Sequence, residues 1–220
     1  MSDPAARQCS SLGFPLALAV LCLVPTLALA DASGGRAVSL TTVSTILADL
    51  PPTHSSGAEH ADITIIEYFD YNCPVCRRVE PDLRRLVAQD PKVRWVHKDW
   101  PVFGEASRYA AFSAFAAARL GKYSLAHDAL MGSRRDLDSA EDVQATLRAA
   151  GLDVTAIDAD VTRHSREYAD VLARNAREAA TLGLRGTPAL IVGDQVISGV
   201  LDLPRLQKLI ADSRRRSGHR

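Results

Sequence analysis

The chain has 220 residues, of which 26 are basic, 26 are acidic and four are cysteines, and 47% of its residues are hydrophobic. The balanced charge lacks the basic excess on which nucleic-acid binders depend, so it argues against a nucleic-acid partner. The hydrophobic content argues against an intrinsically disordered chain, and the length suffices for a buried core.

The first thirty residues differ in composition from the rest. An apolar run over residues 16–24 follows Arg7, and Ala28-Leu29-Ala30 comes just before Asp31. This pattern is typical of a secretory signal peptide, so we expect residues 1–30 to be removed by cleavage after Ala30. An uncleaved membrane anchor is the alternative, but the nine uninterrupted apolar residues fall short of the roughly 20 that cross a bilayer.

Signal cleavage would change the set of cysteines. It would remove Cys9 and Cys22 and leave Cys73 and Cys76 in the mature chain. Exported scaffolds that are stabilised by disulfides carry several bridges between distant segments. A pair separated by two residues closes too small a loop for that purpose. The pair therefore indicates a redox centre, half of a metal site, or a disulfide that stabilises only its own short segment.

The segment that follows the expected signal peptide looks like an N-terminal arm. Residues 31–61 are poor in large apolar side chains and contain paired glycines, prolines and serines, with one short helix expected near residues 41–50. Residues 62–69 are rich in β-branched and aromatic side chains and predict a strand that is covered on both faces.

A helix and a second strand are expected next. The helix begins at Cys73 with Pro74 near its first position, and Pro81 inside it predicts a kink. Residues 92–100 alternate in a way that predicts another strand.

Between residues 106 and 182 the hydrophobic period becomes that of helices. An Ala-rich helix should end at Gly121, and the later helices are expected over residues 123–131, 139–151, 154–163 and 165–182. Residues 189–192 and 195–198 then predict a hairpin around Gly193-Asp194, and a last helix is expected over residues 203–213. This order predicts an α/β sheet domain with a helical insertion.

The main candidate for a catalytic site is Cys73-Pro74-Val75-Cys76, which lies where the predicted strand ends and the predicted helix begins. The free N–H groups and the positive end of a helix lower the pKa of a thiol, so Cys73 should be the nucleophile. Cys76, one turn inside the helix, is suited to resolve a mixed disulfide. A zinc site needs about four ligands, and the six histidines show no ligand spacing: His54, His60, His97, His127, His164 and His219.

Three features together resemble the DsbA-like thiol-disulfide oxidoreductases of the thioredoxin superfamily, in particular bacterial extracytoplasmic members of the Com1 and ScsC kind. They are Glu67-Tyr-Phe-Asp-Tyr-Asn-Cys-Pro-Val-Cys76, Pro81, and Arg185-Gly-Thr-Pro-Ala-Leu-Ile-Val192. The resemblance covers residues 62–210 and implies a periplasmic or other extracytoplasmic location. It also implies a thioredoxin fold over residues 62–105 and 183–220, with the helical insertion at 106–182.

The resemblance further implies roles for three other residues. Thr187 and Pro188 would form a cis-proline loop that faces the disulfide and binds the substrate backbone, although the tripeptide alone would predict an ordinary turn. Glu67 would lie beneath the disulfide and help to move the proton of Cys76. Structural pairing of Glu67, for example with Lys98, is the alternative.

Several neighbouring residues are open to two interpretations. Glu80 matches an acidic position of the family, and Arg77 and Arg78 follow Cys76, but charges on a helix usually form a solvated face. Of the aromatic residues, Tyr71 is the best candidate for a substrate groove. Val75 stands where the strongly oxidising members of the family have a histidine, so we expect a less stabilised thiolate and leave the direction of electron flow open.

The sequence thus predicts an exported protein thiol-disulfide oxidoreductase that acts on substrate proteins with cysteine thiols. We favour an oxidase that donates its disulfide and is restored by a membrane redox partner, which the resemblance implies. No metal, nucleotide or flavin cofactor is needed. The alternatives are an isomerase or reductase with the same residues, and a non-catalytic chaperone or metal-binding module, which would tolerate Cys73→Ser.

Overall fold

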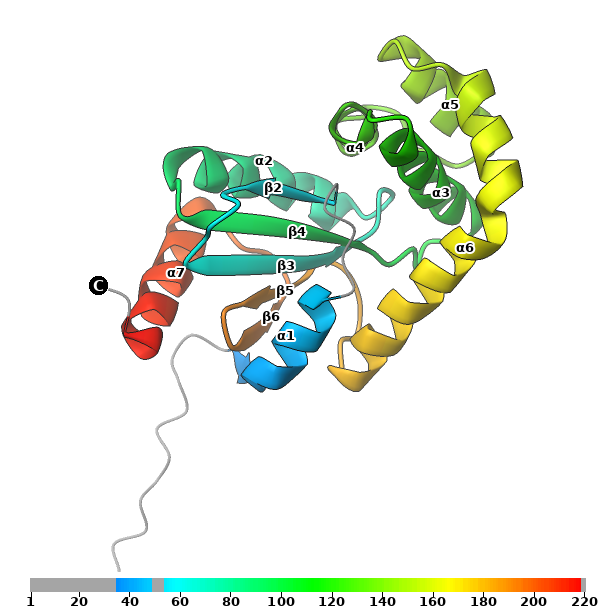
Figure 1. Cartoon of the computed structure of the whole chain (residues 1–220). Helices are drawn as coiled ribbons and strands as arrows, with labels where there is room; N and C mark the ends of the chain where they lie inside the picture. The colour runs from blue at the N-terminus through cyan, green and yellow to red at the C-terminus, as the bar shows by residue number, and fades with distance from the viewer. Residues whose placement is uncertain (1–34, 49–53, 219–220) are drawn as a thin grey trace, which may run out of the picture. The chain divides into compact units, whose positions relative to one another are not determined.

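The computed structural model describes residues 35–48 and 54–218. The expected signal peptide lies outside these residues, as do parts of the expected arm. Within the described residues, six strands form one mixed sheet in the order β1-β6-β5-β3-β4-β2, and seven helices accompany it (Figure 1).

The centre of the sheet lies where the sequence predicts its strands. β3 (Ile63–Phe69) and β4 (Val93–Asp99) are parallel and are connected by α2 (Pro74–Gln89). β5 (Ala189–Val192) pairs antiparallel with β3, and β6 (Gln195–Ser198) pairs antiparallel with β5. The βαβ unit and the hairpin therefore meet along β3.

Two short strands extend the sheet at its edges. β1 (Arg36–Ala37) pairs with β6, and β2 (Ser55–Gly57) pairs with β4, with α1 (Leu40–Ala48) between them in the chain. Part of the segment that the sequence assigns to an arm thus lies in the sheet. Strands of two or three residues are too short to show the alternation by which strands are predicted.

Each face of the sheet is covered by helices, because alternate residues of a strand point to opposite faces. One core joins Ile65 and Trp95 to apolar residues of α2 and of α7 (Leu203–Ser217). On the other face, Ile66 and Val96 pack with residues of α1 and with Ala179.

The helical insertion consists of α3 (Glu105–Arg119), α4 (Tyr123–Met131), α5 (Ala140–Ala149) and α6 (Val154–Thr181). Three of these helices lie where the sequence predicts them. The two helices expected over the last part are one continuous helix of 28 residues, because that segment contains no glycine or proline that would interrupt it. Among the helices of the described residues, none combines the length and the apolar character that a membrane span requires.

A third core joins the insertion to the sheet domain. Cys73 and Cys76 belong to it together with Phe69, Tyr71 and buried residues of the helical insertion. The cysteine pair therefore lies at the junction between the two parts of the fold.

Candidate active site

The two cysteines lie at the start of α2. Cys73 is the N-cap residue, and its backbone N–H donates to the carbonyl oxygen of Asp70. Pro74 occupies the first helical turn, where a missing N–H is tolerated. The N–H of Cys76 donates to the Cys73 sulfur over 3.4 Å. The cap thus directs the positive end of the helix at Cys73.

The environments of the two thiols shift their pKa values in opposite directions. Hydrogen bonds from the Cys76 thiol and from backbone N–H groups outweigh the burial of Cys73 and lower its pKa to about 6. Burial raises the pKa of Cys76 well above its usual range, and the negative charge of Glu67 adds to this effect. At neutral pH, Cys73 is therefore a thiolate and Cys76 a thiol.

The loop before β5 approaches Cys73 from the far end of the chain. Tyr68 of β3 and Ala189 of β5 are register partners, and this pairing brings the preceding residues to the cysteines. The Cys73 sulfur lies 3.2 Å from the carbonyl oxygen of Thr187, and the peptide bond between Thr187 and Pro188 is cis.

Glu67 is fully buried, and it is near enough to both cysteines for their charges to affect one another. The indole Nε1 of Trp95 donates to its Oε2 over 3.1 Å. Burial raises the pKa of Glu67 well above its usual range, and the charge of Glu80 raises it further. The suggested pairing with Lys98 is wrong, because Lys98 is the register partner of Tyr68 and therefore lies on the opposite face. Its ammonium pairs with Glu178 over 2.8 Å.

The charged residues of α2 do not all form a solvated face. Arg78 is exposed, but Arg77 donates to the carbonyl oxygens of Tyr71, Ser133 and Arg135. The expected solvated face is therefore wrong for Arg77, because it lies against the loop between α4 and α5.

Two further expectations need correction. Glu80 is buried and pairs with Arg84, because α2 packs against α4. Tyr71 is 1% exposed, and its hydroxyl lies 3.1 Å from Nδ1 of His127. It belongs to the core and not to a substrate groove.

A cluster of buried histidines beside the redox pair was missed by the sequence analysis. The rings of His97 and His127 stack with centroids 4.3 Å apart, and His54 stacks on Tyr123. The sequence offered a signal for His97 alone. The alternation of its strand places His97 on the same face as Trp95, which could have predicted that its side chain is buried. Within residues 35–48 and 54–218, no group of three or more His, Cys, Asp or Glu side chains is arranged to hold a metal ion.

The model of the DSBA-like thioredoxin domain matches residues 64–211, which is more than half of the chain. The chain belongs to this family. It is a thiol-disulfide oxidoreductase with an α/β thioredoxin fold and a helical insertion, and the predictions of family, fold and enzyme class are confirmed.

Solved structures agree with this assignment. A thioredoxin-like oxidoreductase from Silicibacter pomeroyi is 36% identical with a TM-score of 0.70, and the alignment covers 75% of this chain and 94% of that chain. A periplasmic thioredoxin-like protein from Salmonella enterica is 25% identical with a TM-score of 0.67, covering 81% and 98%. The thiol-disulfide exchange protein alpha-DsbA2 from Wolbachia pipientis is 26% identical with a TM-score of 0.70, covering 78% and 94%.

The curated proteins that match the chain are named as sodium/proton antiporters. Na(+)/H(+) antiporter NhaA 3 from Salinispora tropica is 27% identical over 164 residues, which are 71% of this chain and 24% of the antiporter. The chain thus spans about a quarter of the length of the curated relatives that it matches. Ion antiport is a property given for those longer proteins.

Proposed function

We propose that Cys73 and Cys76 are the redox pair of an exported oxidase that transfers its disulfide to cysteine-containing substrate proteins. The observation that carries the proposal is the opposite effect of the site on the two thiols. The pKa of Cys73 is lowered to about 6, whereas that of Cys76 is raised. A stabilised Cys73 thiolate is a good leaving group, which favours release of the disulfide to a substrate.

The reaction takes place in two exchange steps. A substrate thiolate attacks the Cys73 sulfur, a mixed disulfide forms, and Cys76 leaves as a thiolate that takes up one proton. A second substrate thiolate then attacks the substrate sulfur of the mixed disulfide, and Cys73 leaves as a thiolate. The substrate loses two electrons and the enzyme gains them. Glu67, which is buried and raises the pKa of Cys76 by its charge, is the proposed proton donor to Cys76.

The loop of Thr187 and Pro188 is the proposed substrate-binding element. The carbonyl oxygen of Thr187 lies 3.2 Å from the Cys73 sulfur, so a peptide held along this backbone would present its cysteine to the nucleophile.

We also propose that the protein is exported. The apolar segment at residues 16–24 supports this, and one structural relative is described as periplasmic. A membrane redox partner would restore the disulfide. The proposal keeps residues 62–105 and 183–220 as the thioredoxin part and residues 106–182 as the insertion.

The reduction potential of the Cys73–Cys76 pair tests the direction of the reaction. We expect a value of about −120 to −160 mV in glutathione buffers, toward the oxidising end of the known range. A value of about −230 mV or lower would instead identify a reductase or isomerase. The absence of reversible exchange would contradict every redox function.

Labelling with iodoacetamide tests the assignment of the nucleophile. In the reduced protein we expect one reactive thiol, with half-maximal labelling rate near pH 6 because the pKa of Cys73 is about 6. Cys76→Ser should keep this profile, and Cys73→Ser should abolish it and also the exchange activity. A reactive thiol in native Cys73→Ser would show that the roles are reversed.

A further inference from the structure

Cys76 and its proposed proton partner have no direct route to solvent on the substrate side. Both Cys76 and Glu67 are 0% exposed. In the mixed disulfide, the substrate is bonded to Cys73 and occupies the approach beside Thr187. The proton that Cys76 exchanges must therefore cross the protein interior, because a buried thiolate or carboxylate without a proton is strongly disfavoured.

The histidine cluster begins directly beside Glu67. Glu67 and His97 are register partners on the parallel strands β3 and β4, so their side chains lie on the same face. The Oε1 atom of Glu67 and the Nε2 atom of His97 are both buried, and neither has a hydrogen-bond partner among the described residues. Neighbouring strand positions thus carry a carboxyl oxygen and an imidazole nitrogen that are not committed to other partners.

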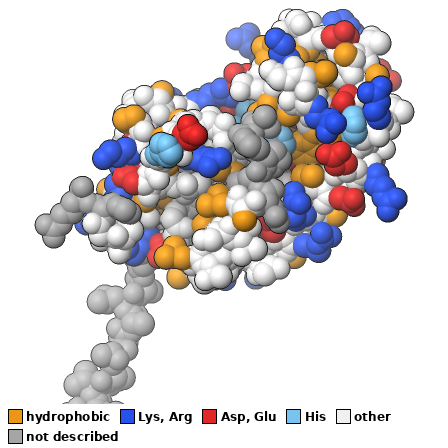
Figure 2. All heavy atoms as spheres, viewed as in Figure 1, with side chains coloured by type: hydrophobic (Ala, Val, Ile, Leu, Met, Phe, Trp, Pro, Cys, Tyr) orange, Lys and Arg blue, Asp and Glu red, His pale blue; other side chains and the backbone are white. Residues whose placement is uncertain are grey.

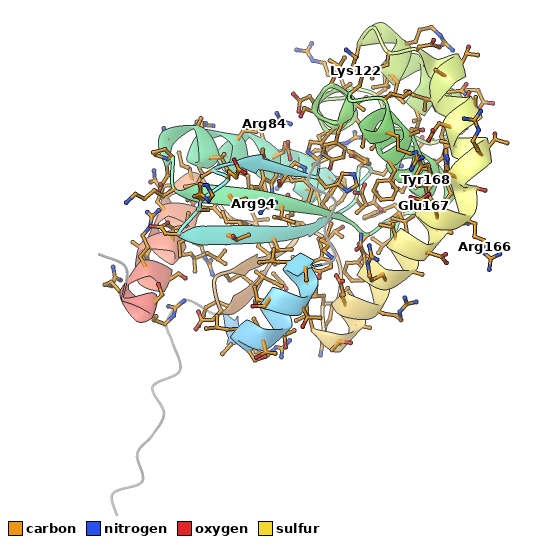
Figure 3. All side chains as sticks on the ribbon, viewed as in Figure 1. Arg84, Arg94, Lys122, Arg166, Glu167 and Tyr168 are labelled. Atoms are coloured by element: carbon orange, nitrogen blue, oxygen red, sulfur yellow. The ribbon has the colours of Figure 1, made fainter. Side chains whose placement is uncertain are left out.

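The cluster continues from His97 toward α2. The His97 ring stacks on His127 of α4 with centroids 4.3 Å apart, and Nε2 of His127 lies 3.3 Å from Oε1 of Glu80. Glu80 pairs with Arg84, which is labelled on α2 in Figure 3 and also pairs with Asp128. The buried groups therefore lead from the sheet to a partly exposed arginine.

The cluster ends at an opening that is separate from the substrate side. A pocket of about 280 Å³ lies between α2, α4 and β2, and Arg84, His97 and His127 are among the residues that line it. Arg84 is the first residue of α2 that lines this pocket, and it lies ten positions after Pro74. Ten positions correspond to about 15 Å along the helix axis. A substrate at Cys73 would leave this opening free.

We propose that Glu67, His97, His127 and Glu80 form the path along which the proton of Cys76 exchanges with solvent in this pocket, with the hydroxyls of Tyr123 and Tyr71 connecting the two imidazoles. The inference rests on the proposed function of the Cys73–Cys76 pair. The path lets the buried thiol change its protonation state while a substrate covers the other side of the site.

The protonation states of the cluster suit this role. Burial lowers the pKa of His127 to about 3 and that of His97 well below its usual range. A neutral imidazole can accept a proton at one nitrogen and release one at the other. The Nδ1 atom of His97 lies 3.1 Å from the hydroxyl of Tyr123, and that of His127 lies 3.1 Å from the hydroxyl of Tyr71. These two hydroxyls are hydrogen-bonded to each other, so they connect the two imidazoles in a way that the stacked ring faces cannot. Burial also raises the pKa values of Glu67 and Glu80, bringing carboxyl protonation closer to neutral pH.

Other charged or titratable groups face the path from each neighbouring element. They are Arg84 on α2, Asp99 on β4, Asp128 on α4, and His54 before β2. His54 stacks on Tyr123 and Phe115 within the same buried cluster but does not lie between Glu67 and the pocket. It therefore provides a matched control.

The test is the reaction of the reduced protein with glutathione disulfide, followed in two phases. In the first, Cys73 attacks the disulfide and releases one glutathione. In the second, Cys76 loses its proton and attacks the Cys73 sulfur, which releases the second glutathione and forms the Cys73–Cys76 disulfide. Only the second phase requires the buried proton to leave.

We expect His127→Ala to slow the second phase at least 10-fold and to leave the first phase within twofold. Imidazole at millimolar concentration should restore the second phase, because the cavity left by the substitution adjoins the pocket. His54→Ala should leave both phases within twofold. Glu80→Gln, which nearly preserves volume, should also slow the second phase and serves if His127→Ala does not fold.

Three results would overturn the proposal. The first is a second-phase rate within twofold of the wild type in both His127→Ala and Glu80→Gln. The second is an equal slowing of this phase in His54→Ala, and the third is a slowing in His127→Ala that imidazole does not reverse. The last two would identify a purely structural cluster. Loss of both phases in the unsubstituted protein would overturn the proposed function itself, and this path with it.

Discussion

Glu67 combines a strongly buried position with an incomplete set of hydrogen bonds. Its Oε2 accepts from Trp95, whereas its Oε1 has no hydrogen-bond partner among the described residues. An ionised carboxylate in such a place is unfavourable, which is why burial raises the pKa of Glu67. The folded protein thus gives up stability to keep this carboxyl beside Cys76.

Replacing this carboxyl by an amide should stabilise the protein in a pH-dependent way. The folded pKa of Glu67 lies above the unfolded value, so the penalty is absent below about pH 4 and grows as the pH rises above the unfolded pKa. We expect Glu67→Gln to raise the free energy of unfolding of the oxidised protein by about 1–3 kcal/mol at pH 8 and by little at pH 4. Urea unfolding at the two pH values measures the difference.

The control for this variant is Glu59→Gln, at an exposed position. It should change the free energy of unfolding by less than about 0.5 kcal/mol at either pH. An equal gain from Glu67→Gln at pH 4 and pH 8 would contradict the electrostatic explanation and point to packing instead.

At the scale of elements, α6 joins the insertion to the sheet. Its first half packs with α3 and α5, and its second half reaches β4, where Asn175 donates to the carbonyl oxygen of Asp99. Glu178 accepts from Lys98, which is 2% exposed, and from the hydroxyl of Tyr68. A buried ammonium therefore depends on a carboxylate supplied by α6.

Removing that carboxylate should destabilise the fold. We expect Glu178→Gln to lower the free energy of unfolding by about 2–4 kcal/mol, because the Lys98 charge stays buried without its partner. Adding Lys98→Met should recover most of the loss. Glu167→Gln, which removes an exposed ion pair with Arg119 on the same helix, should change it by less than about 1 kcal/mol. Urea unfolding compares the four proteins, and similar effects of the two Gln variants would contradict the role of burial.

The elements were predictable to the extent that their residues carry a local pattern. β3 and β4 have the apolar character of covered strands, and the caps of α2 and α5 lie at Cys73 and Ser139 as expected. The edge strands were not predictable, because pairing at an edge depends on the neighbouring strand and not on their own few residues. The two helices expected over residues 154–163 and 165–182 are the single helix α6, which packs along α3.

The site was predictable where it is local and not where it depends on packing. Cys73 and Cys76 are adjacent in sequence, so their positions at a helix start follow from the motif. His54, His97 and His127 come from β2, β4 and α4, or just beside them, and meet only because α4 packs near α2 and β4. Their clustering depends on how the insertion packs against the sheet domain, and the sequence pattern of the insertion indicated no function for it.

At the scale of the molecule, the redox pair is connected to both parts of the fold. Asn72 exchanges hydrogen bonds with the backbone of Leu137 in the insertion, and Asp70 accepts from the N–H groups of Val102 and Phe103. Val102 and Phe103 are exposed apolar residues beside the site. Elsewhere, basic and acidic side chains are interspersed over the face in Figure 2, as the balanced composition implies.

Because the cysteines belong to a shared core, their redox state should affect the stability of the whole protein. The folded pKa of Cys73, about 6, lies below that of an unfolded thiol. The thiolate therefore stabilises the reduced fold fully above the unfolded pKa, and this contribution is lost as the pH falls through about 6. The corresponding disulfide adds little, because it closes a very short loop in the unfolded chain.

We therefore expect the reduced form to gain about 2–3 kcal/mol relative to the oxidised form between pH 5 and pH 8. Urea unfolding of both forms at the two pH values measures this gain. A thermodynamic cycle links this gain in stability to the reduction potentials: the potential of the folded pair should rise relative to that of the unfolded pair by the same free energy. Glutathione buffers with and without denaturant measure the two potentials independently. Reduced Cys73→Ser should lack the gain. If reduced Cys73→Ser kept it, the stabilisation would come from another group, and the lowered pKa of Cys73 could not be what makes the folded disulfide oxidising.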